Sequence, residues 1–184
     1  MEEDSMTATL DYGITAGVLS EHVVSAPTSP RPHLQRVLLT EPPSRVFDVR
    51  LSQLTMTIKL TGEEPAWLYR TLESMQRLSR LPANWSSYGS HRIEDVAIIS
   101  AARLLTKVLG HQGFAPTVMP TLHGGVQLEW HRDGSDVEIE FSADGLVSYV
   151  YAYDRHRDAT WETEQFTGET LQRIKTTISR LAQH

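Results

Sequence analysis

The residues best suited to chemistry lie between Gly124 and Asp154, in the stretch GGVQLEWHRDGSDVEIEFSADGLVSYVYAYD. Within it, Glu129, His131 and Glu138 carry the carboxylate and imidazole groups that bind divalent metals or exchange protons. A metal-dependent hydrolase or nuclease that uses these three residues is therefore one hypothesis. Their spacing matches no metal-binding signature, so we predict no catalytic residue, no metal site and no cofactor from this pattern.

Other catalytic signatures are also missing from the sequence. It contains no cysteine, which excludes disulfides, thiolate zinc sites and a cysteine nucleophile. It has no Gly-x-Ser-x-Gly elbow, no Walker loop and no dinucleotide-binding fingerprint. The pair Gly124-Gly125 favours a tight turn over a phosphate-binding loop. Binding therefore explains this sequence better than catalysis does.

The same stretch predicts an antiparallel meander over residues 126–153. Apolar and polar residues alternate, and two Asp-Gly pairs, at 133–134 and 144–145, are typical of two-residue hairpin turns. If both turns are two-residue loops, the two hairpins agree on which residues face the core. Leu128, Trp130 and Ile139 are among these residues. The opposite face then carries acids, one histidine and three tyrosines, namely Glu129, His131, Asp136, Glu138, Glu140, Tyr149, Tyr151 and Tyr153.

In this register Glu129 lies directly opposite Glu138, and like charges in that position are unfavourable. Three explanations remain open. Cations of the same chain, such as Arg50 or Lys59 on a neighbouring strand, neutralise the acids. A basic protein partner docks on the face and uses the tyrosines as anchors. The carboxylates and His131 bind a divalent metal.

The charge distribution bears on the choice of partner. The net charge is −6 at pH 7, and residues 126–154 contain seven acids and one arginine. Such a segment repels nucleic acid, and it either attracts a basic partner or cations or forms an ordinary solvated sheet face. No apolar run approaches the roughly 20 residues of a membrane span. We therefore predict a cytoplasmic protein with a basic protein partner, and we expect neither nucleic acid nor a membrane as a partner.

The remaining segments must position this face. Residues 1–35 contain several prolines and are predicted to be a flexible arm, whereas 36–184 form a single domain. Alternation predicts strands over 46–51 and 54–60, with a bulge or turn near Gln53.

Periodicity predicts helices between Pro65 and Pro82, over 93–109, and after Thr167 as N-cap, the second being buried on more than one face. Pro120 suggests that a short strand before the meander lies at a sheet edge. The fold class that follows is α+β, with an antiparallel sheet of three to five strands and about three helices packed on one face.

Between the first two helices, the loop NWSSYGSH presents Trp85 and Tyr88 among small residues. In one interpretation, Trp85 closes the end of the core and Gly89 permits the turn. In the other, the two aromatic side chains contact a partner.

NWSSYGSHRIEDVAIISAARLL, followed by PTVMPTLHGGVQLEW and an acidic hairpin, resembles a family of small uncharacterised bacterial proteins. Their pattern is N-W-D-x-Y-G, an Ala-rich helix and P-x-x-x-P-x-x-x-G-G-x-x-x-E-W, and the match runs from Asn84 to about Tyr153. Ser86 replaces the usual aspartate. The resemblance implies a bacterial or phage source and no known activity, with a signature formed by Trp85, Tyr88, Gly89, Gly124, Gly125, Glu129 and Trp130.

The leading hypothesis is a non-enzymatic interaction protein, such as an antitoxin, an inhibitor or a subunit of a complex. It would bind a basic protein through the acidic and tyrosine-bearing face, with Trp85 and Tyr88 as further contacts. Self-association through an edge strand, such as the one near Pro120, is a third hypothesis and would give a homo-oligomer.

Overall fold

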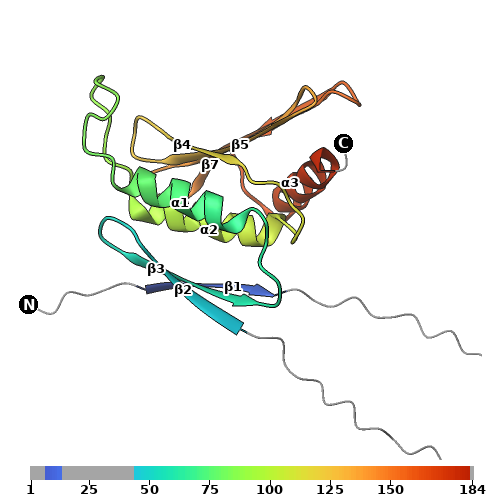
Figure 1. The fold of residues 1–184 in the computed structure, drawn as a ribbon. Helices are drawn as coiled ribbons and strands as arrows, with labels where there is room; N and C mark the ends of the chain where they lie inside the picture. Colours follow the sequence, from blue (N-terminus) through green and yellow to red (C-terminus); the bar gives the residue numbers. More distant parts are fainter. Residues whose placement is uncertain (1–6, 14–43, 183–184) are drawn as a thin grey trace, which may run out of the picture.

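The computed structural model describes residues 7–13 and 44–182, which Figure 1 shows as two sheets with helices between them. No helix in these ranges is long and apolar enough to cross a membrane. The elements, in chain order, are β1 (Thr7–Gly13), β2 (Ser44–Arg50), β3 (Thr55–Thr61), α1 (Leu68–Ser79), α2 (Asp95–Val108), β4 (Thr117–Pro120), β5 (Val126–Arg132), β6 (Ser135–Phe141), β7 (Val147–Asp154), β8 (Ala159–Thr163) and α3 (Gly168–Leu181).

The larger sheet has five antiparallel strands in the order β4-β5-β6-β7-β8. Its helix side packs on α1 and α2, and α3 contacts β6 and β7 on the same side (Figure 1). The predicted α+β class, with an antiparallel sheet and three helices on one face, is confirmed. Strand β4, which ends at Pro120, lies at the sheet edge, as its proline predicted.

A second sheet on the other side of α1 and α2 was not predicted. Its order is β1-β3-β2, with β1 parallel and β2 antiparallel to β3. Strand β1 comes from the predicted flexible arm 1–35. The rest of that arm, and its boundary with the domain, lie outside the described residues. Because sheets cover α2 from both sides, that helix needs apolar residues around most of its circumference.

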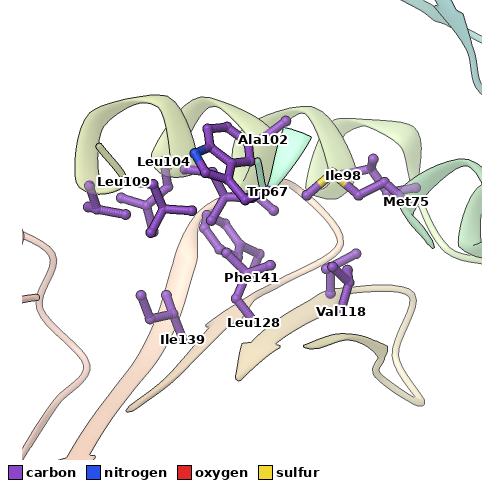
Figure 2. Close-up of a cluster of buried hydrophobic side chains, with 14 of the residues drawn as sticks. Trp67, Met75, Ile98, Ala102, Leu104, Leu109, Val118, Leu128, Ile139 and Phe141 are labelled. Atoms are coloured by element: carbon purple, nitrogen blue, oxygen red, sulfur yellow. The ribbon is translucent and has the colours of Figure 1, made fainter. Parts of the chain in front are cut away.

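The hydrophobic core extends from β3 of the second sheet through the helix layer to the larger sheet. Figure 2 shows Leu128, Ile139 and Phe141 of the sheet directed towards side chains of the helix layer, among them Trp67 and Leu104. All five are buried, with exposed fractions of 4% or less. Each such side chain contributes roughly 1.5–3 kcal/mol when it leaves water. This layer fixes which face of the meander points away from the core.

The N-terminal residue of α2 fastens the second sheet to the helix layer. Asp95 is only 5% exposed, and its carboxylate accepts hydrogen bonds from the backbone N–H groups of Gln53 (2.7 Å) and Leu54 (2.8 Å). These residues form the turn between β2 and β3, where Leu51 N–H donates to the Leu54 carbonyl. The irregularity predicted near Gln53 is therefore confirmed as a turn. Thr167 also acts as predicted, because its hydroxyl caps α3 by accepting from Thr170 N–H.

The two Asp-Gly turns differ from each other. Asp133 (φ 49°) and Gly134 (φ 78°) both adopt positive φ, as a two-residue turn requires. At the second turn only Gly145 (φ 80°) does, and Ser142 N–H donates to the Leu146 carbonyl around a three-residue loop. The prediction of a two-residue loop was wrong there. A register shift between Glu140 and Phe141 offsets the extra residue, so the pairing beyond it is unchanged.

Candidate functional site

The open face of the larger sheet has the predicted register. Glu129 lies opposite Glu138, and Glu138 lies opposite Tyr151 on the next strand. No described element covers this face (Figure 1). We call it the acidic face and define it by the residues predicted from the sequence, all partly or largely exposed to solvent: Glu129, His131, Asp136, Glu138, Glu140, Tyr149, Tyr151 and Tyr153.

Strand β8 adds one acid that the sequence reasoning missed. Glu162 pairs with Tyr151 in the ladder and accepts a 2.6 Å hydrogen bond from the Tyr149 hydroxyl. This hydrogen bond to a carboxylate is the main reason why the pKa of Tyr149 rises to about 12. The segment ATWET, in which threonines and a tryptophan surround Glu162, has the composition of a short strand. From that composition the sequence could have predicted β8.

The like-charge pair is bridged by a side-chain amide. Gln127 Nε2 lies 2.9 Å from Glu129 Oε1 and 3.3 Å from Glu138 Oε2, and it donates to both. Gln127 sits on the same face, two residues before Glu129. The amide supplies hydrogen bonds but no positive charge, so the two carboxylates remain electrostatically uncompensated by it.

His131 connects Glu129 to a third carboxylate, that of Asp136. Its Nδ1 lies 2.6 Å from Asp136 Oδ1, and its Nε2 lies 3.4 Å from Glu129 Oε2. The hydrogen bond with Asp136 is the largest cause of a raised pKa of His131, and Glu129 adds to it, whereas burial acts in the opposite direction. The protonated ring is the form that can donate to both acids.

The metal-dependent hydrolase hypothesis requires Glu129, His131 and Glu138 to act together. Both ring nitrogens of His131 lie near carboxylates, Nδ1 beside Asp136 and Nε2 beside Glu129. Within the described ranges, no group of three or more histidine and acidic side chains is arranged to hold a metal ion. Glu138 is directed to Gln127 and forms no such group with Glu129 and His131.

The proposed neutralisation by Arg50 or Lys59 is wrong. Both residues lie in the second sheet, on strands β2 and β3, across the helix layer from the meander. In the part of the chain that the structure describes, no lysine or arginine forms an ion pair with Glu129, Asp136, Glu138 or Glu140. The single histidine is the only cationic group that this part of the chain directs to them.

The loop with Trp85 and Tyr88 forms a separate surface. Asn84 (φ 59°) and Ser87 (φ 65°) adopt the left-handed region, and Asn84 Oδ1 accepts a 2.7 Å hydrogen bond from Gly89 N–H. Tyr88 is 88% exposed. Trp85 is half-buried, its Nε1 donates to the His91 carbonyl at 3.2 Å, and within the described residues it stands outside the hydrophobic core. The prediction that Trp85 closes the core is therefore not supported.

This loop docks on the turn between β4 and β5. His91 N–H donates to the Leu122 carbonyl, and Glu94 N–H donates to the Gly124 carbonyl, each at 2.9 Å. The turn precedes β5, whereas His131 lies near its far end. The structure therefore does not bring Trp85 and Tyr88 together with the His131 end of the acidic face.

The paired glycines serve the fold, in agreement with the predicted turn. Gly124 has φ 85°, and a Cβ there would lie 2.7 Å from the Arg92 carbonyl oxygen. A Cβ on Gly125 would lie 2.0 Å from the Phe141 carbonyl oxygen. Trp130 is fully buried, and its Nε1 donates to the Phe114 carbonyl at 3.2 Å. Gly124, Gly125 and Trp130 of the motif signature therefore have structural roles. Glu129 of the same signature lies on the acidic face.

Comparisons with protein-family models, with curated proteins and with solved structures found no match to this chain. The kinship with small bacterial proteins, suggested by the Trp-x-x-Tyr-Gly and Gly-Gly-Val-x-Leu-Glu-Trp elements, therefore stays a prediction.

Proposed function

We propose that this protein is an interaction module that binds a basic protein partner through the acidic face. The observation that carries the proposal is the lack of compensating cations: within the described residues, His131 alone pairs with these carboxylates. Glu162 extends the negative charge to the sheet edge. A partner with lysine and arginine side chains would supply the missing charge.

The tyrosines add aromatic surface beside the carboxylates of the acidic face. Tyr149, Tyr151 and Tyr153 lie in one column on β7, opposite Glu140, Glu138 and Asp136 respectively. Each carboxylate therefore has a phenol ring beside it. An arginine or lysine of the partner can form an ion pair with the carboxylate of such a pair. Its guanidinium plane or alkyl stem can then pack on the tyrosine ring. Tyrosines are enriched in interfaces for these reasons.

The architecture supports binding rather than catalysis on this face. The acids lie on a face of the sheet that no described helix or strand covers, and such a covering is what would exclude water from a catalytic site. Opposite charges on an exposed surface mainly accelerate association and select the partner, and each contributes modestly to affinity. Those features suit an antitoxin, an inhibitor or a subunit that recognises a basic protein.

A charge-reversal experiment tests the proposal. The double variant Glu138→Lys/Glu140→Lys reverses two adjacent charges in the centre of the acidic face. Tagged wild-type protein and variant are used to capture partners from the source cells at low salt. We expect the basic proteins recovered with the wild type to be lost with the variant, because like charges now face each other.

The matched control is Glu63→Lys/Glu73→Lys, which changes the net charge equally at side chains that are 86% and 68% exposed and lie away from the acidic face. Circular dichroism checks that all three proteins are folded. Equal recovery with the wild type and the acidic-face variant would contradict the proposal, as would equal loss with both variants.

A further inference from the structure

A cavity of about 280 Å³ opens on the helix side of the larger sheet, beside the turn between β5 and β6. It is lined by Arg132, Arg157 and Arg180, together with Ser135 and Thr177. Figure 1 shows α3, which carries Arg180 and Thr177, beside this part of the sheet. The cavity is thus on the opposite side of the sheet from the acidic face.

Strand alternation places the first of these arginines. Arg132 follows His131 on β5, so it points to the helix side while His131 points to the acidic face. Its guanidinium lies 5.5 Å from the centre of the Phe114 ring, which helps to orient it. Arg157 comes from the turn between β7 and β8, and Arg180 from the last turn of α3. Three distant segments therefore bring their cations to one cavity.

The arginines are only loosely paired. Asp154 Oδ2 lies 3.8 Å from Arg157 Nε and 3.8 Å from Arg180 Nη1, and Asp133 Oδ2 lies 3.9 Å from Arg132 Nε. Among the described residues, none of these three guanidiniums donates a hydrogen bond, although each has five N–H donors. Three cations thus share two carboxylates and retain unused donors that face a cavity.

A neighbouring hollow of about 380 Å³ lies along α3. The two share Asp154, Arg157, Thr177 and Arg180. The second hollow reaches Trp161, over whose ring Arg173 lies at 4.3 Å from the centre. A small anionic head beside the three arginines would therefore have room for an attached organic group along the helix.

We propose that this arginine cavity binds the phosphate group of a phosphomonoester, with the organic part of the ligand in the neighbouring hollow. Guanidinium forks match the oxygen geometry of phosphate and bind it in bidentate fashion. A phosphate group presents several strong oxygen acceptors to the donors of the three arginines, whereas chloride is a single point charge. Ser135 adds a hydroxyl, which accepts from Arg155 N–H at 2.9 Å and keeps its own hydrogen for a ligand oxygen. The site is independent of the proposed function of the acidic face.

Titration of the full chain with inorganic phosphate and with phenyl phosphate, at constant ionic strength set with chloride, tests the proposal. Amide and guanidinium NMR shifts, together with calorimetry, report the binding. We expect both probes to shift signals of Arg157, Arg180 and Thr177, and phenyl phosphate to bind more tightly. No saturable shift at these residues would overturn the site, and equal affinity for the two probes would overturn its assignment to phosphomonoesters.

Three variants sharpen the result. Arg180→Gln removes one donor fork and should weaken phenyl phosphate binding by about tenfold or more. Arg77→Gln, on α1, removes an exposed guanidinium whose partners among the described residues, Glu73 and Ser74, lie on its own helix, and it should leave binding unchanged. Asp154→Asn keeps an oxygen for His156 N–H and removes the competing charge, so it should tighten binding. Equal weakening in Arg180→Gln and Arg77→Gln, or weaker binding in Asp154→Asn, would overturn the proposal.

Discussion

The two faces of the larger sheet carry charges of opposite sign. His131 and the acids point away from the helices, whereas the next residue, Arg132, points to the helix side and lines a cavity with Arg157 and Arg180. A strand sends neighbouring side chains to opposite faces, so the arginines of the cavity cannot reach the carboxylates of the acidic face. The sheet thus keeps apart charges that would neutralise each other if they shared one surface.

The difference lies in how each face compensates its own charge. On the acidic face, Gln127 bridges Glu129 and Glu138, and His131 bridges Glu129 and Asp136, at distances from 2.6 to 3.4 Å. In the cavity, the ion pairs are 3.8 to 3.9 Å long. Both arrangements leave charge uncompensated, of opposite sign, and this is why we assign a basic protein to one face and a phosphate group to the other.

The largest expected effect is a difference in the free energy of unfolding between substitutions on the two sides of β5. Trp130→Ala empties a fully buried site and removes the hydrogen bond to Phe114, so we expect a loss of about 3–5 kcal/mol in the free energy of unfolding. Glu129→Ala, one residue away on the acidic face, should change it by less than about 0.5 kcal/mol. Urea denaturation measures both, and similar losses would show that the assignment of faces is wrong.

A smaller effect tests the like-charge pair. Glu138→Gln keeps a hydrogen-bond partner for Gln127 and removes the repulsion from Glu129, so the free energy of unfolding should rise by roughly 0.2–1 kcal/mol. Glu73→Gln on α1 serves as the control, since that carboxylate lies beside Arg77 and should show no gain. A loss of stability in Glu138→Gln would indicate that the acids of this face are already compensated.

The pH dependence follows from His131. Its pKa is raised above the ordinary value of 6.5, so the stability it contributes is fully present below about 6.5 and is lost as the pH rises through the higher folded-state pKa. The advantage of the wild type over His131→Gln should therefore be constant below about pH 6.5 and shrink as the pH rises above it. His123→Gln is the control. Denaturation at several pH values measures the difference, and a constant difference would contradict the predicted pairing with Asp136.

The same titration should affect the partner. Loss of the His131 proton makes the acidic face more negative, so a basic protein should bind more tightly as the pH rises through that pKa. In His131→Gln this increase should be absent. Binding that weakens with rising pH in the wild type would argue against a basic partner on this face.

The smallest effect concerns Tyr149. Its hydrogen bond to Glu162 raises its pKa from the ordinary value of 10.0 to about 12, so it should ionise late when the protein is titrated with base. The stability from this bond is present below the ordinary value of 10.0 and is lost as the pH passes about 12. Ultraviolet absorbance should show one late-ionising tyrosine that disappears in Tyr149→Phe. An unchanged titration curve would show that the bond does not form.

The local elements were largely predictable because their signals are local. Alternation along β5, β6 and β7 predicted which residues face the core, and the helices around Leu72, Leu105 and Ile174 followed from their periodicity. The pairing of Glu140 with Tyr149 was predicted from a turn of the wrong length, since the register shift beside Glu140 compensated for the longer loop. The predicted pairing was therefore correct, although the loop length from which it was derived was wrong.

The sequence by itself determined the two faces of the meander, because a period of two residues sorts side chains within each strand. Only the tertiary structure decided that β2 and β3 form a separate sheet, which removes Arg50 and Lys59 from the acids, and that α3 brings Arg180 beside Arg132. Those outcomes depend on how whole layers pack. Packing between segments far apart in the chain leaves no periodic trace in any one of them.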